Sequence, residues 1–177
     1  ISAYGEPEFK SNMKDTQDLE KQQIINNKNY YLISSLDQID EWIKEAEEVG
    51  EVAVDTETTS LNPHQADLVG ISLCSKIGKA CYIPVGHKSS KCVNKNDVIK
   101  KLKELLEDPS VKKIGQNIKF DFIVFYKHGI TLSSMEDTML MSYVLDGGKN
   151  RHNMDTLSEI HLGHKTISLN VIVLCPK

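Results

Sequence analysis

The sequence predicts an α/β fold in which helices flank a mixed β-sheet. Segments with the two-residue period of strands alternate along the chain with segments that have the 3.6-residue period of helices. No internal repeat interrupts this alternation, and the 177 residues suit one compact domain with a tail. Hydrophobic residues make up 40% of the chain against 26% charged ones, a balance typical of globular proteins.

The bulk composition sets limits on function before any motif is considered. The net charge of -4 excludes a strongly basic coat for nucleic acid, so any such partner must be gripped locally or through metal ions. The four cysteines form no C-x-x-C pair, which argues against structural zinc. Because there is no long apolar span, we expect a cytoplasmic protein without a membrane segment and with reduced thiols.

The first half of the chain is expected to supply a tail, one helix and four strands. Residues 1–28 are polar and are interpreted as a linker, with room for a short helix over 18–25, so the domain is assigned to 29–177. A capping box of Ser35 and Gln38 opens a helix that Gly50 closes. The strands are expected over 29–34, 51–55, 68–75 and 79–85, the last two as a hairpin around Gly78.

The second half is expected to be mainly helical. An amphipathic helix over 94–110 is stopped by Pro109, and a short strand follows over 111–115. Three further helices are predicted over 117–129, 135–146 and 154–163. The predicted sheet therefore contains the strands near residues 30, 52, 69, 80 and 112.

The stretch VAVDTETTSLNP, residues 52–63, places two carboxylates on one face of a strand. Asp55 and Glu57 are two residues apart and therefore point the same way. Like charges held close together repel, so these two side chains either face water or share a cation. Oxygen ligands favour Mg²⁺ or Mn²⁺ over zinc. The alternative is a plain solvated strand end.

A second polar pair lies in KKIGQNIKFDFIVFYKHGI, residues 112–130. Asn117 and Asp121 are four residues apart, which predicts that they share one face of a helix. Asp121 stands among strongly apolar neighbours, so it is either paired in the core or directed into a cleft. The alternative is an Asn at the helix start and an Asp that the helix dipole favours in an early turn.

Together, D-x-E on a strand and N-x-x-x-D some sixty residues later resemble the DEDD superfamily of 3'-5' exonucleases. The strings VDTETTSL, IGQNIKFD, DTMLMSYVLD and RHNMDTLSEIHLGHKTI are similar to the proofreading exonuclease domain of bacterial DNA polymerase I. The resemblance runs roughly from residue 30 to residue 168. It implies a ribonuclease H-like fold and metal-dependent removal of nucleotides from DNA 3' ends. It also implies that the protein acts in the cytoplasm, in association with the nucleoid.

The resemblance also assigns roles to individual residues. Asp55, Glu57 and Asp121 match the carboxylates that hold two Mg²⁺ or Mn²⁺ ions in the family. The single-stranded 3' end of DNA and a polymerase domain are the implied partners. The positions expected to contact the terminal nucleotides are Thr58, Leu61, Gln116, Asn117, Lys119, Phe120, Met139 and Arg151. For Phe120, Met139 and Leu61 a place in the core is the alternative, and for Arg151 an ordinary surface position.

The sequence departs from the family at its third motif, Tyr-x-x-x-Asp. Tyr126 is followed at that spacing by Ile130, and Tyr143 by Gly147. We therefore expect a C-terminally incomplete fold and weak nuclease activity, with Asp137 and Asp155 as the first substitutes for the missing ligand. The alternatives are an inactive exonuclease-like scaffold or DNA-binding module and, disfavoured by RHNMDTLSEIHLGHKTI, a ribonuclease D-like RNA trimmer.

Overall fold

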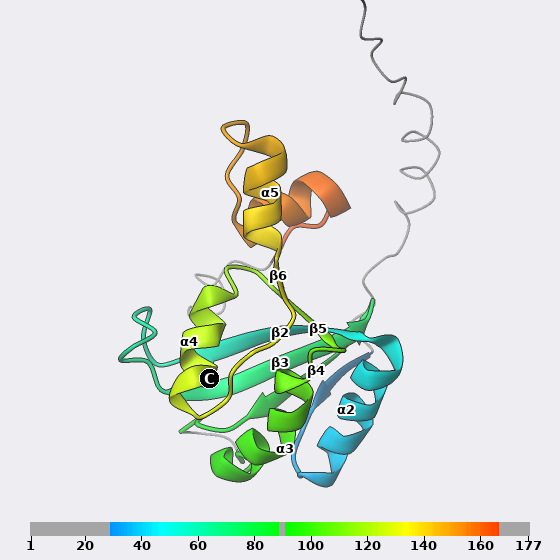
Figure 1. Ribbon diagram of the computed structural model, residues 1–177, viewed down its shortest axis with the longest axis vertical. Helices are drawn as coiled ribbons and strands as arrows, with labels where there is room; N and C mark the ends of the chain where they lie inside the picture. Colours follow the sequence, from blue (N-terminus) through cyan, green and yellow to red (C-terminus); the bar gives the residue numbers. More distant parts are fainter. Residues whose placement is uncertain (1–28, 89–90, 167–177) are drawn as a thin grey trace, which may run out of the picture. The chain divides into compact units, whose positions relative to one another are not determined.

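A computed structural model describes residues 29–88 and 91–166. Within the residues up to 154, a six-stranded mixed sheet has helices packed against it (Figure 1). The strand order is β1-β4-β3-β2-β5-β6. Strand β3 is antiparallel to both β2 and β4, whereas the pairs β1–β4, β2–β5 and β5–β6 are parallel. The strands are β1 (Tyr30–Leu32), β2 (Glu51–Thr58), β3 (Leu68–Lys76), β4 (Lys79–Pro84), β5 (Lys112–Gly115) and β6 (Met135–Asp137). The predicted α/β class is confirmed.

The helices follow the strands in the predicted alternation. They are α2 (Asp37–Val49), α3 (Lys95–Glu107), α4 (Lys119–Lys127), α5 (Thr138–Asp146), α6 (Met154–Leu157) and the π-helix η2 (Ser158–Leu162). The chain divides into two compact units, and the one formed by Asn26–Met154 contains the whole sheet. The second unit includes η2. The single helix expected over 154–163 is instead a short α-helix, α6, followed by the π-helical turn η2.

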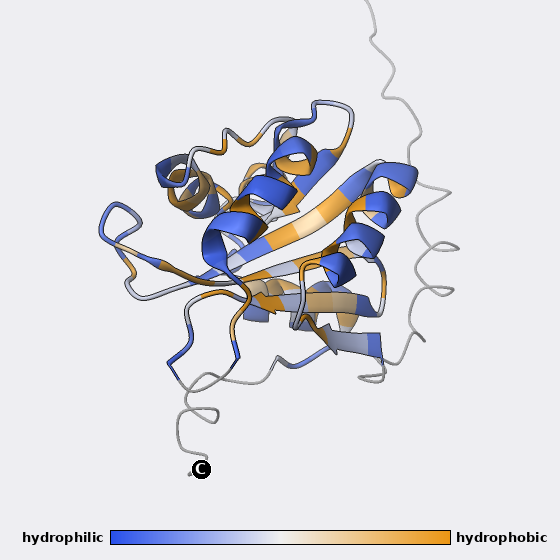
Figure 2. Ribbon diagram, turned by 90° about the horizontal axis from the view of Figure 1, so that it is seen from below, coloured by the Kyte–Doolittle hydropathy of each residue, from blue (hydrophilic) through white to orange (hydrophobic). Residues whose placement is uncertain are grey.

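The core lies between one face of the sheet and the helices α2, α3 and α4. Alternate residues of β2, among them Val52 and Val54, point into this core and are 1% and 3% exposed. The helices contribute Trp42 from α2 and Leu102 from α3 to the same cluster. Figure 2 shows hydrophobic residues along the central strands and hydrophilic ones on the outer faces of the helices. Asp55 and Glu57 occupy the opposite, exposed register of β2.

Local sequence signals fix several element ends as predicted. Gly50 adopts a φ of 80°, which glycine reaches without strain, and it ends α2. The hairpin turns at Gly78, with a φ of 77°. The capping box is only half formed, because Gln38 Oε1 accepts from the backbone N–H of Ser35 at 3.2 Å while no side chain caps the N-terminus of α2.

The segment 135–146 differs from the helix that its apolar residues predict. Its first three residues form β6, which extends the sheet beside β5 and pairs Ile114 with Glu136. The helix begins only at Thr138, because the Asp137 carboxylate caps it by accepting from the N–H groups of Met139 and Leu140. Pairing with the sheet thus overrides the helical period of residues 135–137.

Some expectations concern residues that lie outside the described ranges. The linker interpretation of residues 1–28 and its short helix belong to this group, as does the resemblance beyond residue 166. Among the residues of the two described ranges, none belongs to a helix with the length and hydrophobicity needed to cross a bilayer.

Candidate active site

A polar pocket of about 450 Å³ lies where the end of β2 meets the start of α4. It is lined by three kinds of structure: the last residues of β2, the loop after it, and the turn that leads into α4. Of the eleven site residues predicted from the sequence, eight line this pocket. They are Asp55, Glu57, Thr58, Leu61, Gln116, Asn117, Phe120 and Asp121. The structure therefore brings together acids that lie more than sixty residues apart in the chain.

Asp121 is the acid that the fold holds most firmly. It stands in the first turn of α4 and is only 3% exposed. Its Oδ1 accepts two hydrogen bonds from Thr56, one from the backbone N–H at 2.9 Å and one from the hydroxyl at 2.6 Å. Because Thr56 occupies the buried register of β2, these bonds tie the start of α4 to the strand that carries Asp55 and Glu57.

The carboxylates of the pocket repel one another. Burial of its carboxyl group, together with the charges of Asp121 and Glu57, raises the pKa of Asp55 to about 6. Burial also raises the pKa of Asp121, although the two bonds from Thr56 oppose that shift. The Asp55 residue as a whole remains exposed. The negative charge of this pocket is not balanced by a cationic side chain among its lining residues.

The ligand atoms that line this pocket suit a divalent cation, but the spacing of its acidic side chains does not yet form a metal site. All the strong donors are oxygen atoms, the ligands that Mg²⁺ and Mn²⁺ favour. The side-chain oxygen of Asn117 is buried and has no hydrogen-bond partner. Within residues 29–88 and 91–166, however, no three His, Cys, Asp or Glu side chains are arranged closely enough to hold a metal ion. The acids share a pocket without forming a closed ligand set.

Asn117 reaches the pocket in a different way from the one the sequence predicts. It precedes α4, which begins at Lys119, and has a φ of 58°, in the left-handed region that Asn tolerates better than most residues. Asn117 and Asp121 therefore do not share a helix face, and that expectation is wrong. The backbone N–H of Asn117 donates to Asp137 Oδ1 at 3.0 Å, which fixes the strained turn.

The remaining pocket residues divide into exposed and structural ones. Leu61 is 98% exposed in the loop after β2, so the core alternative does not apply to it. Phe120 is half-buried and packs against the core while also lining the pocket. Gln116 donates to the carbonyl of His152 at 2.7 Å and accepts from Thr138 Oγ1 at 2.5 Å, so both ends of its amide are engaged within the fold.

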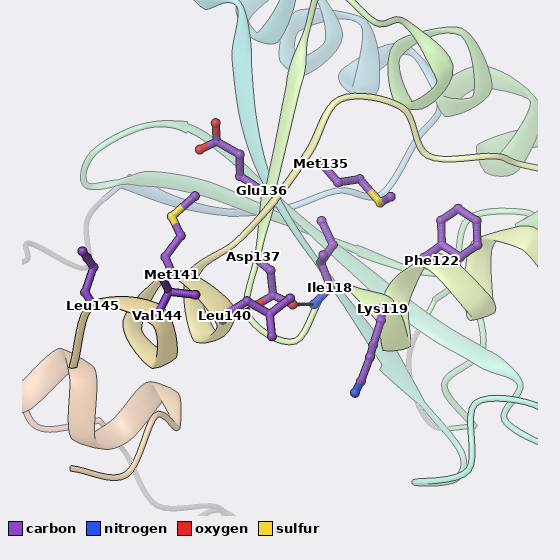
Figure 3. Close-up of a pocket in the computed structure, with 10 residues that line it drawn as sticks. All are labelled: Ile118, Lys119, Phe122, Met135, Glu136, Asp137, Leu140, Met141, Val144 and Leu145. Atoms are coloured by element: carbon purple, nitrogen blue, oxygen red, sulfur yellow. Dashed lines mark hydrogen bonds between the residues drawn. The ribbon is translucent and has the colours of Figure 1, made fainter. Parts of the chain in front are cut away.

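Three predicted site residues lie outside this pocket. Lys119 lines a separate groove of about 800 Å³ that runs along α4, β6 and α5 (Figure 3). Met139 is half-buried in the first turn of α5, and Arg151 is exposed between α5 and α6. Their proposed contacts with nucleotides stay predictions.

The larger groove lacks the chemistry of a metal site. Its walls are mainly apolar, formed by residues such as Phe122, Leu140 and Val144 (Figure 3). Its two acids are already engaged, since Glu136 pairs with Lys112 at 3.0 Å and Asp137 accepts from backbone N–H groups. The smaller polar pocket is therefore the better candidate active site.

Sequence reasoning missed two residues that build this site. Thr56 lies between the two exposed acids of β2, so its position in the buried register could have indicated a polar partner inside. Asp137 precedes the helical run that starts at Thr138, and an Asp in that place is a known N-cap signal. It was considered as a substitute metal ligand, whereas in the structure its carboxylate binds backbone N–H groups. The other candidate, Asp155, binds the Thr166 hydroxyl within the second unit.

Comparisons with known proteins match the same region of the chain. The family described as 3'-5' exonuclease matches residues 30–173. The DNA polymerase I of Rhizobium leguminosarum is 43% identical over 159 residues, covering 78% of this chain and 16% of that protein. The chain thus spans about a sixth of that relative.

Two solved structures support the fold. Brucella melitensis NrnC with bound Mg²⁺ has a TM-score of 0.60 and 24% identity, covering 84% of this chain and 68% of that one. Escherichia coli RNase D, an exoribonuclease involved in structured RNA processing, has a TM-score of 0.64 and 20% identity. That match covers 81% of this chain and 36% of RNase D. Both likenesses confirm the predicted ribonuclease H-like exonuclease fold.

Proposed function

Because the chain belongs to the 3'-5' exonuclease family that includes the proofreading domain of DNA polymerase I, we propose that it removes nucleotides from DNA 3' ends. The observation that carries this proposal is the polar pocket at the end of β2, where Asp55, Glu57 and Asp121 come together. The raised pKa values of Asp55 and Asp121 indicate that their negative charges are unfavourable in this pocket, so a bound cation would stabilise them.

In this proposal Asp55, Glu57 and Asp121 hold Mg²⁺ or Mn²⁺. When bound, such ions stabilise the negative charge that a phosphodiester gains during in-line displacement by water. The protein's own part is to place the ligands. Thr56 fixes the orientation of Asp121 through two hydrogen bonds, and the sheet fixes Asp55 and Glu57 on neighbouring positions of one strand face. The partner-free Asn117 oxygen offers a further acceptor at the same pocket.

The apolar residues of the pocket would contact the terminal bases. The Leu61 side chain is exposed to solvent, and the half-buried Phe120 lines the pocket beside the acids. Lys119 and Arg151 would add contacts to phosphates from outside the pocket. Because so few cations are available, binding of single-stranded DNA should have a log-log salt slope no steeper than about -4.

A second function is favoured by one observation. This second function is an exonuclease-like module that binds DNA without cutting it. In the described part of the chain the acids do not form a closed ligand group, which is what such a module would show. The proposed nuclease instead closes its ligand set when the cation binds. The two functions differ in whether the DNA is shortened.

The test is a nuclease assay on a single-stranded oligonucleotide labelled at its 5' end. We expect slow shortening from the 3' end in Mn²⁺, none in EDTA, and none after Asp55→Asn. Asp40→Asn is the matched control, because Asp40 pairs with Lys101 on the surface of α2 and α3 and should leave the rate unchanged. Equal rates for wild type and Asp55→Asn would contradict the proposal, and faster cutting of the matching RNA would favour an RNase D-like activity.

A further inference from the structure

Tyr82 lies beside the candidate active site, on a strand that the predicted site does not include. In the sheet, Tyr82 of β4 pairs with Ser72 of β3, and Ser72 in turn pairs with Asp55 of β2. Residues paired directly across neighbouring strands point to the same face of a sheet. Tyr82 therefore shares a face with Asp55 and Glu57.

Gly70 allows the Tyr82 hydroxyl to approach Glu57. A Cβ atom at Gly70 would lie 1.9 Å from the Tyr82 hydroxyl oxygen and 2.2 Å from Cζ, so only glycine leaves room for this ring. Gly70 is also the direct cross-strand partner of Glu57. Since the side chains of directly paired residues start about 5 Å apart, the hydroxyl occupies the place of a side chain next to Glu57.

His87 holds the hydroxyl in that place. Its Nε2 lies 2.6 Å from the Tyr82 oxygen, and the two rings meet edge to face with centroids 5.7 Å apart. The loop that carries His87 is itself fixed, because the N–H groups of Val85 and Gly86 both donate to the carbonyl of Val69 at 2.9 Å. A tyrosine hydroxyl ordinarily keeps its proton at neutral pH.

We propose that Tyr82 is a positioning residue for the metal ligand Glu57. In this arrangement His87 donates from Nε2 to the tyrosine oxygen, and the tyrosine proton is then free to be donated to the Glu57 carboxylate. The hydrogen bond holds that carboxylate over the pocket. The inference rests on the proposed function, since Glu57 needs to be positioned only if it binds the cation.

A role of Tyr82 in packing alone accounts for this arrangement less well than a role in positioning Glu57. Tyr82 lies on the exposed face of the sheet, so packing alone would not require its hydroxyl to displace a side chain at position 70. A hydrophobic residue at position 82 with an ordinary residue at position 70 would cover the strand equally well. The space made by Gly70 serves the hydroxyl end of the ring.

The test is Mn²⁺ binding by calorimetry on the full chain, with Tyr82→Phe as the main variant. Loss of one hydrogen bond to a charged group predicts a Kd about tenfold weaker. Tyr30→Phe is the matched control, because Tyr30 is another exposed tyrosine on the same face of the sheet and should keep the wild-type Kd. In the oligonucleotide assay, Tyr82→Phe should raise the Mn²⁺ concentration for half-maximal rate and leave the rate at saturating Mn²⁺ nearly unchanged.

A pair of His87 variants separates this role from a loss of stability. The side-chain amide of Gln can donate from a position close to that of Nε2, so His87→Gln should retain Mn²⁺ binding, whereas His87→Leu should weaken it as Tyr82→Phe does. Wild-type Kd values for Tyr82→Phe and His87→Leu would overturn the inference and leave the proposed function intact. If the wild-type chain binds no Mn²⁺ and cuts no DNA, the proposed function fails and the inference fails with it.

Discussion

Asp121 in the first turn of α4 and Asp137 at the N-cap of α5 are both buried carboxylates, and the protein satisfies them in opposite ways. Asp137 is 8% exposed and accepts from four backbone N–H groups, those of Asn117 and Ile118 before α4 and of Met139 and Leu140 in α5. Asp121 accepts two hydrogen bonds from Thr56 and lies among other acids, and burial raises its pKa. Asp137 joins two helix starts, whereas Asp121 contributes charge to a pocket.

The difference separates a carboxylate that backbone N–H groups compensate from one that lies among other acids. Backbone N–H groups at a helix start compensate a carboxylate completely, so Asp137 needs no further partner. A set of acids with raised pKa values destabilises the fold unless a cation joins it. The predictions below test this contrast, beginning with the largest effect.

The largest contrast should be in catalysis. Asp121→Asn removes one proposed metal ligand, and a loss of metal-centred stabilisation of about 4 kcal/mol would slow the reaction about a thousandfold. Asp137→Asn keeps one acceptor oxygen for the N–H groups that Oδ1 binds and loses only the bond from Ile118 to Oδ2, so its rate should remain within a fewfold of wild type. Single-turnover rates on the labelled oligonucleotide in Mn²⁺ compare the two variants. Similar losses in both would show that the two acids do not differ in role.

In stability the order of the two acids should reverse. Asp137→Ala removes a helix cap and leaves buried N–H groups without partners, which should lower the free energy of unfolding by about 2–4 kcal/mol. Asp121→Ala relieves repulsion while it loses the bonds to Thr56, so its net effect should be smaller. Urea unfolding in EDTA measures both, and a larger loss for Asp121→Ala would contradict the account.

The pH dependence of stability should identify the acid pocket. The folded-state pKa of Asp55, about 6, lies above its ordinary value of 3.8, so the folded state binds the proton more tightly than the unfolded state. The stability that this group contributes is complete below pH 3.8, falls as the pH rises towards 6, and is lost above it. Asp55→Asn should therefore gain stability relative to wild type across this window. Parallel curves for the two proteins in EDTA would count against a repelling acid set.

The smallest effect concerns the residue that holds Asp121. Thr56→Val keeps the shape of the side chain and the backbone bond but removes the hydroxyl bond, so it should cost about 1 kcal/mol of stability. Thr58→Val is the control, because the Thr58 hydroxyl donates to the backbone of Ser60 and not to an acid. Thermal unfolding of both variants, with and without Mn²⁺, would show whether only Thr56→Val also weakens the stabilisation by the cation.

The sequence was sufficient to predict the elements whose ends are marked by local signals. Gly50 and Gly78 occupy the backbone conformations that glycine favours, and the alternation of Val52 and Val54 with the acids of β2 gives the correct strand faces. The same two-residue period explains why Asp55 and Glu57 lie on one face of β2 and line the same pocket. These features depend on neighbours within a few residues.

The features that could not be predicted depend on contacts between distant segments. The strand β6 forms because β5 offers it an edge, and nothing within residues 135–137 specifies that edge. The left-handed turn at Asn117 depends on the carboxylate of Asp137, twenty residues away. The approach of Tyr82 to Glu57 depends on Gly70, which a strand pattern alone marks only as an interruption.

The central claim is that Asp55, Glu57 and Asp121 form a divalent cation site. The most direct measurement is a Mn²⁺ titration at neutral pH followed by water-proton relaxation, on the wild-type chain, on Asp55→Ala and on the surface control Asp40→Asn. The account predicts weak, saturable binding by wild type and Asp40→Asn that Asp55→Ala loses. Equal Mn²⁺ binding by wild type and Asp55→Ala would contradict it.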